Sequence, residues 1–145
     1  MVKILVKKIY KNIKLPVYKT SGSSGMDLLA YIKKKITINP NKTAIVPTGI
    51  AVAIPKNYEI QIRPRSGLAA KNGISVLNTP GTIDSDYRGE IKIILINLGR
   101  KSFVINSGDR VAQMILSPVV KAKLVEIKKL PETVRGKKGF GSTGK

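Results

Sequence analysis

The sequence predicts an all-β fold, a sandwich or jelly roll with one short helix, on three observations. Apolar and β-branched residues alternate or run together over most of the 145-residue chain. Turn signals separate these runs at the spacings that short antiparallel strands require. Only one segment has a convincing helix start. A chain of this length fits one domain with a substantial core.

The expected strands follow in order along the chain. Residues 43–54 and 59–63 are rich in Ile, Val and Ala and are bounded by Pro, Gly and Asn. At the centre of residues 90–97 both the odd and the even positions are apolar, which is typical of a strand covered on both faces. Shorter strands are expected near residues 3–6, 102–105, 111–118 and 124–127, with turns at 39–41, 55–57, 98–99 and 106–109.

One short helix is expected at residues 67–72. Ser66 is its predicted N-cap and Gly73 its stop. Backbone N–H groups near Arg65 would then be free to face an anion. After this helix, residues 78–87 are expected to form a hairpin whose arm carries two carboxylates.

The chain changes character at residue 131. Pro131 and a series of glycines interrupt the periodicity, so we expect a folded domain at 1–130 and a glycine-rich tail at 131–145. The tail satisfies Gly-x-Gly-x-x-Gly formally, but no helix follows it, so a dinucleotide or Walker-type site is excluded. Its glycines can still surround a phosphate, helped by Arg135, Ser142 and Thr143, while Phe140 can stack on a base.

The absence of certain residue types limits the chemistry. The chain contains neither histidine nor cysteine, so imidazole bases, thiol nucleophiles and the common zinc ligands are missing. Catalysis must therefore use carboxylates, hydroxyls or a hard metal ion, and Asp84 and Asp86 are the first candidates. No apolar run approaches the length of a membrane span and the N-terminus has no signal architecture, so a cytoplasmic protein is expected.

The formal net charge of +19 admits two interpretations. Nucleic acid or another polyanion is one possible partner. However, the 21 lysines are scattered along the whole chain, which favours diffuse solvated charge. Five of the six arginines lie in segments that contain glycine or acidic residues, where their planar fork suits phosphate: Arg63, Arg65, Arg88, Arg110 and Arg135.

Five short motifs occur in order over nearly the whole chain. They are residues 24–30 (Ser-Gly-Met-Asp-Leu-Leu-Ala), 64–69 (Pro-Arg-Ser-Gly-Leu-Ala), 78–90 (Asn-Thr-Pro-Gly-Thr-Ile-Asp-Ser-Asp-Tyr-Arg-Gly-Glu), 110–115 (Arg-Val-Ala-Gln-Met-Ile) and 135–144 (Arg-Gly-Lys-Lys-Gly-Phe-Gly-Ser-Thr-Gly). Together, and in this order, they resemble the five motifs of the trimeric dUTPases (deoxyuridine 5′-triphosphate nucleotidohydrolases).

The resemblance implies a jelly-roll subunit in a homotrimer, with active sites at subunit boundaries. The C-terminal tail of one subunit would close a site that two others build. The implied reaction is Mg²⁺-dependent hydrolysis of dUTP to dUMP and diphosphate, which limits uracil incorporation into DNA and supplies the precursor of dTMP. Nucleic-acid binding is not expected to be the primary function.

The same resemblance implies a role for each matching residue. Asp84 is the catalytic base, and Asp27 contacts Mg²⁺ through water. The 78–87 hairpin lines the uracil. Tyr87 packs under the sugar and excludes a 2′-hydroxyl by occupying its space. The implied substrate contacts are Arg65, Ser66, Gly67, Asn78, Gly81, Thr82, Ile83, Asp84, Tyr87, Lys92, Gln113, Arg135, Phe140, Gly141, Ser142 and Thr143. Asp86, Arg88 and Glu90 are expected to form interface or structural ion pairs rather than to take part in chemistry.

The sequence departs from the family motifs at two positions. Lys138 stands where the fifth motif usually has glycine, and Ser24 where the first usually has alanine.

Two alternative functions stay open. A dCTP deaminase of the same fold shares the second and third motifs but typically lacks the glycine-rich tail. A basic β-domain that binds nucleic acid would need aromatic side chains on a basic face, and the chain has only seven aromatic residues.

Overall fold

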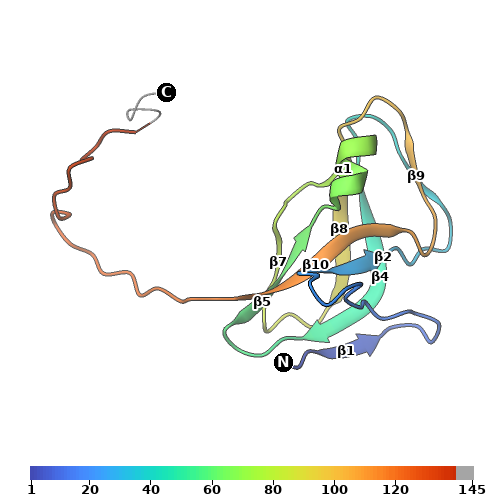
Figure 1. Cartoon of the computed structure of the whole chain (residues 1–145), viewed down its shortest axis with the longest axis horizontal. Helices are drawn as coiled ribbons and strands as arrows, with labels where there is room; N and C mark the ends of the chain where they lie inside the picture. Colours follow the sequence, from blue (N-terminus) through green and yellow to red (C-terminus); the bar gives the residue numbers. More distant parts are fainter. Residues whose placement is uncertain (140–145) are drawn as a thin grey trace.

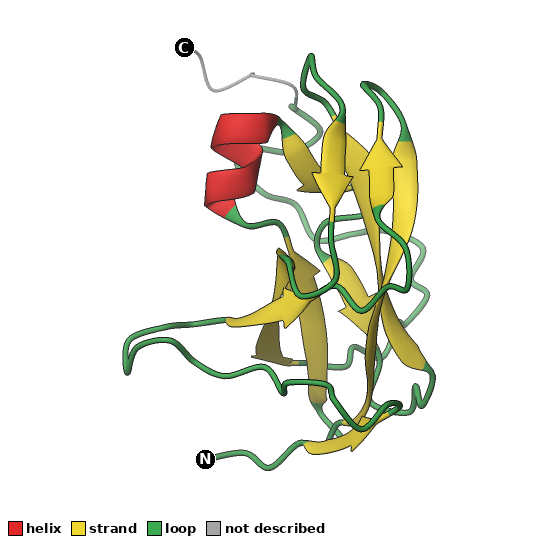
Figure 2. Ribbon diagram, turned by 90° about the vertical axis from the view of Figure 1, so that its right-hand side faces the viewer, coloured by secondary structure: helices red, strands yellow, loops and turns green. Residues whose placement is uncertain are grey.

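Two antiparallel sheets of four strands each face one another across the core. The computed structural model describes residues 1–139 of the chain. One sheet has the order β1-β4-β8-β6, the other β2-β10-β5-β7, and β3 pairs with β9 in a separate two-stranded ribbon. Figure 2 shows the strands in layers with the single helix at one end. The predicted all-β class with one short helix is confirmed.

The strands and the helix have the following bounds: β1 Leu5–Lys8, β2 Met26–Leu29, β3 Ile36–Ile38, β4 Thr43–Ala53, β5 Tyr58–Arg63, α1 Ser66–Asn72, β6 Ile74–Val76, β7 Gly81–Ile83, β8 Glu90–Asn97, β9 Phe103–Ile105 and β10 Arg110–Pro118. The long strands lie where sequence periodicity predicts them. The strands β2, β3 and β6 were not predicted, because three or four residues are too short for an alternating pattern to stand out.

The core fills the space between the two sheets. One face of β8 contributes the fully buried Ile91, Ile93 and Leu95, which pack in the same cluster as Ile60 of β5 and Leu28 of β2. Burying such branched side chains stabilises the fold by roughly 1.5–3 kcal/mol each. The opposite face of β8 is only partly covered, since Lys92 is exposed and Ile94 and Ile96 are half-buried. The prediction that β8 is covered on both faces is therefore wrong for the single chain.

The helix α1 begins one residue earlier than predicted. Arg65, with an extended backbone, is the N-cap, and no side chain caps the helix, so the prediction of Ser66 as the cap is wrong. The helix ends as predicted at Gly73, whose φ of +68° is the left-handed conformation that favours glycine. A Cβ at Gly73 would lie 2.5 Å from the Gly99 nitrogen, so a larger residue would also push this turn apart.

The segment after β10 leaves the folded body. Within the described residues the last backbone hydrogen bond to the body runs from Val119 N to Asn57 O (2.8 Å), and residues 120–139 extend away from the sheets (Figure 1). The strand predicted at 124–127 is not formed, and Leu124 is 93% exposed. An apolar strand needs a partner edge, and residues 1–139 offer none where this segment runs.

Candidate active site

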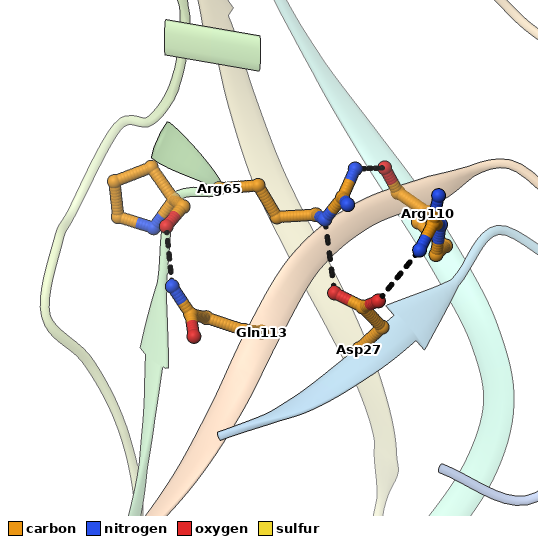
Figure 3. Close-up of polar contacts among 5 residues, drawn as sticks. Asp27, Arg65, Arg110 and Gln113 are labelled. Carbon is orange, nitrogen blue, oxygen red and sulfur yellow. Dashed lines mark hydrogen bonds and ion pairs between the residues drawn. The ribbon is translucent and has the colours of Figure 1, made fainter. Parts of the chain in front are cut away.

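A carboxylate held between two arginines forms the centre of the first cluster of predicted site residues. Asp27 lies on β2, and its Oδ1 accepts a hydrogen bond from Nε of Arg65 at 2.9 Å (Figure 3). Its Oδ2 pairs with a terminal nitrogen of Arg110 at 3.3 Å. The Asp27 side chain is 18% exposed, so the two cations compensate a carboxylate that water solvates only in part.

Strand pairing explains how this cluster forms. In the sheet, Asp27 of β2 is paired with Gln113 of β10, and Gln113 is paired with Arg63 at the end of β5. Arg65 follows two residues later and reaches across β10 to Asp27 (Figure 3). Three predicted site residues, Asp27, Arg65 and Gln113, are therefore brought together by one row of the sheet.

The side chain of Gln113 fixes the segment that leads into the helix. Its Nε2 donates a hydrogen bond to the backbone oxygen of Pro64 at 3.0 Å (Figure 3). A Cβ at Gly25 would lie 2.6 Å from Gln113 Oε1, so glycine at this position in the first motif leaves room for the amide. Ser66 and Gly67 follow directly in the first turn of α1, and both are exposed. Apart from its chain neighbours and the backbone of its own helix, no heavy atom of residues 1–139 lies within 4 Å of a Cβ built on Gly67, so this side of the backbone is open to a ligand.

Arg110 belongs to this cluster, although the sequence indicated it only as one of five arginines suited to phosphate and not as a substrate contact. Besides its side-chain contact with Asp27, its backbone oxygen accepts a hydrogen bond from NH1 of Arg65 at 3.2 Å. The available signal was its position as the first residue of the fourth motif. Its place in the motif does not show that β2 and β10 pair at this point, which is what brings Arg110 close to Asp27.

The second cluster lies on β7 and the turn that follows it. Gly81 is buried, and a Cβ there would lie 3.2 Å from the side-chain nitrogen of Asn78, so the Asn78 amide packs directly on the Gly81 backbone. Thr82 and Asp84 are exposed, and Ile83 is half-buried. The strand β7 is the edge of its sheet, so one side of its backbone has no partner strand in this chain.

The predicted hairpin arm is not regular. The strand β7 pairs with β5, whereas β8 pairs with β4 and β6 in the other sheet. Residues 84–89 therefore cross between the sheets as a turn, in which Tyr87 N donates to Asp84 O at 3.2 Å. The hairpin prediction is wrong because the chain changes sheets between residues 83 and 90, and turn signals do not indicate this.

Tyr87 folds back over the turn. Its hydroxyl donates to the backbone oxygen of Glu90 at 3.1 Å, and a Cβ on Gly89 would lie 2.3 Å from the Tyr87 hydroxyl oxygen. Glycine at position 89 therefore allows the ring to take this position. The ring is 44% exposed, so part of it remains available to a ligand.

Arg88 and Glu90 make structural hydrogen bonds, but neither of them nor Asp86 forms an ion pair within residues 1–139. Arg88 donates to the backbone oxygens of Ser85 (2.7 Å) and Tyr87 (2.8 Å). Glu90 accepts a hydrogen bond from the backbone nitrogen of Gly49 at 2.8 Å, which ties the third motif to an irregular point of β4. The ion pairs among residues 1–139 are Asp27 with Arg65, Asp27 with Arg110, and Lys129 with Glu132.

The two clusters lie apart in one copy of the chain. The β5–β7 register pairs Ile62 with Gly81 and Ile60 with Ile83, so Asp84 follows at the level of Glu59. Arg65 is six residues further along the chain than Glu59, which corresponds to about 20 Å at the rise of an extended strand. Aspartate and arginine side chains cannot span this distance and act on one phosphate.

The remaining predicted site residues lie outside both clusters. Lys92 is exposed on β8 and lines a cavity of about 280 Å³ with Tyr10, Tyr31 and Ile45 among its walls. Arg135 lies in the C-terminal segment, where its Nε donates to the backbone oxygen of Lys138 at 3.0 Å. The other four predicted residues lie outside the described residues: Phe140, Gly141, Ser142 and Thr143.

The donor set suits a metal that arrives with its ligand. Residues 1–139 contain no group of three or more acidic side chains that could hold an ion by themselves. Asp27 is the carboxylate of the first cluster, and each of its oxygens has a second lone pair beyond the arginine contact. Mg²⁺ usually keeps several waters and binds through one or two carboxylates together with substrate phosphates. The first cluster fits that pattern.

Sequence comparisons place these residues among known proteins. The dUTPase family profile matches residues 11–144. A deoxyuridine 5′-triphosphate nucleotidohydrolase of Caldanaerobacter subterraneus subsp. tengcongensis is 54% identical over 134 residues, covering 92% of this chain and 90% of the relative. The enzyme of the same name from Fusobacterium nucleatum subsp. nucleatum is 51% identical and covers all of both chains.

Solved structures share the fold. A mutant dUTPase of Staphylococcus bacteriophage 80alpha, solved with dUpNHpp, superposes with a TM-score of 0.87 at 24% identity and covers 98% of both chains. The dUTPase of the Staphylococcus aureus phage phi11, described as showing the coordination of a structural Mg(II) ion, gives a TM-score of 0.80 at 20% identity. It covers 90% of this chain and 99% of the phage chain. No helix of the described residues is long and apolar enough to cross a membrane.

Proposed function

The chain belongs to the dUTPase family and is a dUTP diphosphatase, and from this premise we propose that each of its active sites combines residues from different copies of the chain. One observation carries the proposal: the register of β5 with β7 brings the expected base Asp84 to the level of Glu59, and about 20 Å of extended chain separates Glu59 from Arg65 of the first cluster. A second copy that brings its Asp84 to the first copy's Arg65 completes a site that one copy leaves divided. A homotrimer supplies such a contact three times by symmetry.

The first cluster is the proposed binding site of the triphosphate. Arg65 uses Nε and one N–H of NH1 in the contacts described, so its other N–H groups remain for phosphate oxygens. Ser66 and Gly67 present an exposed turn directly beside it. Mg²⁺ bound with the substrate would neutralise phosphate charge during hydrolysis. Asp27 would orient a water of that ion.

The second cluster is the proposed binding site of uracil and the source of the base. The unpaired backbone edge of β7 offers N–H and C=O groups that can copy a Watson–Crick partner. Asn78 packed on Gly81 leaves little room beside that edge, which disfavours a 5-methyl group. Tyr87 would lie under the sugar. Asp84 is exposed, and its carboxylate would take a proton from the attacking water.

Unpartnered apolar surface supports the proposed assembly. On the outward face of the β1-β4-β8-β6 sheet, Ile45 is 61% exposed and is paired with Ile94. The C-terminal segment likewise carries exposed apolar side chains, among them Leu124 and Leu130. A segment of this kind gains burial by lying against a neighbouring copy. We propose that it carries Arg135 and the glycine-rich end to the neighbour's site, where the tail closes over the substrate.

A product assay tests the reaction and its specificity. We expect diphosphate release from dUTP with Mg²⁺ and little release from dCTP, dTTP or UTP. Ammonia release from dCTP would instead indicate the deaminase reaction of the same fold. Light scattering after gel filtration tests the assembly, with a mass three times 15.8 kDa expected. The expected biological roles, limiting uracil in DNA and supplying dUMP for dTMP synthesis, follow from this reaction. The cytoplasmic location remains a prediction.

A further inference from the structure

We propose that Arg110 is a positioning residue that acts through Asp27. The proposal deepens the function above, on which it rests. Arg110 holds one oxygen of the Asp27 carboxylate, so that Asp27 keeps its orientation while Arg65 turns toward the triphosphate. The strands β2, β5 and β10 meet at this carboxylate, and their pairing fixes where each side chain lies.

A β-bulge directs Arg110 toward Asp27. The pairing of β10 with β2 shifts between Arg110 and Ala112, since Ala112 pairs with Leu28 while Arg110 pairs with Leu29. Val111 and Ala112 are consequently both buried, which breaks the alternation of the strand. In regular alternation Arg110 would share the inward face with Ala112. The extra residue puts Arg110 on the outward face with Gln113, and bulges next to active sites re-aim side chains in this way.

Each of the two arginines contacts a different oxygen of the Asp27 carboxylate. Arg65 contacts Oδ1 at 2.9 Å and Arg110 contacts Oδ2 at 3.3 Å. The side chain of Arg65 is 25% exposed and that of Arg110 is 51% exposed, so Arg65 occupies the more enclosed position. If Arg65 leaves Asp27 for a phosphate, Arg110 remains as the cationic partner. Without it, a carboxylate that is 18% exposed would lose its last cationic side-chain partner in this cluster and the contact that fixes its orientation.

The contact between Arg65 and Arg110 allows a clean test. Arg65 donates to the backbone oxygen of Arg110, and this contact survives any substitution of the Arg110 side chain. Arg110→Gln therefore removes the partner of Asp27 without removing the backbone support of Arg65. Arg110→Lys keeps the positive charge but lacks the planar guanidinium group of arginine. Arg100→Gln, in the turn between β8 and β9, is the matched control for loss of one arginine.

The decisive measurement is a double-mutant cycle with the full-length protein. Binding of a non-hydrolysable dUTP analogue with Mg²⁺ and steady-state kinetics with dUTP are measured for Arg110→Gln, Asp27→Asn and the double variant. We expect Arg110→Gln to weaken analogue binding and raise KM about fivefold, with kcat changed much less. Arg110→Lys should recover part of the loss, and Arg100→Gln should behave as wild type.

The cycle separates positioning from direct contact. If Arg110 acts through Asp27, its substitution has little further effect once Asp27 is Asn, and the two effects are not additive. A fivefold loss that persists in the Asp27→Asn background would overturn the proposal, because Arg110 would then contact the nucleotide itself. An unchanged KM in Arg110→Gln would overturn it too. Failure of the wild-type protein to hydrolyse dUTP would instead refute the proposed function.

Discussion

Asp84 and Arg65 lie at opposite ends of one strand pair, because β7 runs antiparallel to β5 and Asp84 leaves it at the level of Glu59. About 20 Å of extended chain separates Glu59 from Arg65. The residue expected to activate water and the residue expected to hold phosphate therefore belong to different sites in one subunit. This separation is the physical reason why we propose an active site shared between copies of the chain.

Replacing the expected base should abolish turnover without abolishing binding. Asp84→Asn keeps the size of the side chain but cannot accept the proton, so we expect kcat to fall by roughly 10²–10⁴, with KM for dUTP within a few fold of wild type. Asp86→Asn, two residues away on the same exposed turn, is the matched control and should retain activity. Retained turnover in Asp84→Asn would refute the assignment of the base.

The ring of Tyr87, rather than its hydroxyl, should set the preference for deoxyribose. The hydroxyl is already used by the Glu90 backbone oxygen, whereas the ring remains partly exposed. We expect Tyr87→Ala to raise the UTP/dUTP ratio of kcat/KM about 10²-fold and Tyr87→Phe to leave the ratio close to wild type. Equal effects of the two substitutions on this ratio would show that the ring does not exclude the 2′-hydroxyl.

Removing residues 135–145 should separate folding from activity. The core lies between the two sheets and ends near Val119, so the truncated chain should keep its thermal unfolding temperature and its oligomeric mass. Loss of the phosphate and base contacts that we propose for the tail should lower kcat/KM by about 10²-fold or more. Both properties are measured on the same preparation. Unchanged kinetics would mean that the tail takes no part in the reaction.

Chelation of Mg²⁺ should affect activity and leave the fold intact. The described residues contain no cluster that could hold an ion by itself, so we expect the metal to arrive with the triphosphate. EDTA should lower kcat roughly 10²-fold, with recovery on adding Mg²⁺ in excess, while the unfolding temperature measured without nucleotide stays constant. Full activity in EDTA would contradict the assignment of Mg²⁺ to the reaction. A drop in unfolding temperature would indicate a structural ion instead.

The sequence predicted the long strands and the contents of the first cluster well. The apolar pattern of a long strand such as β8 can be seen in its own residues. Gly73 predicts the end of α1, because glycine is favoured in the left-handed conformation that often ends a helix. Asp27, Arg65 and Gln113 were each assigned to the site through a different motif, and the pairing of β2, β10 and β5 brings them together; their roles stay predictions.

The remaining features depend on contacts that a linear pattern does not show. The change of sheets between β7 and β8 depends on which edge each strand finds, so the turn signals alone favoured a hairpin. The position of Arg110 depends on a bulge that reverses its side. The outward face of β8 is only half covered, and no strand forms at 124–127. In both places apolar side chains stay exposed, because no other segment of residues 1–139 packs against them.

Subunit complementation tests the shared site most directly. Asp84→Asn and Arg65→Gln are each expected to be nearly inactive alone, and they are unfolded together and refolded as an equal mixture. If each site takes Arg65 from one copy and Asp84 from another, random mixing leaves about a quarter of the sites with both residues intact. The account therefore predicts recovery of about a quarter of wild-type kcat. A mixture as inactive as its two components, in heterotrimers verified by mass spectrometry, would contradict it.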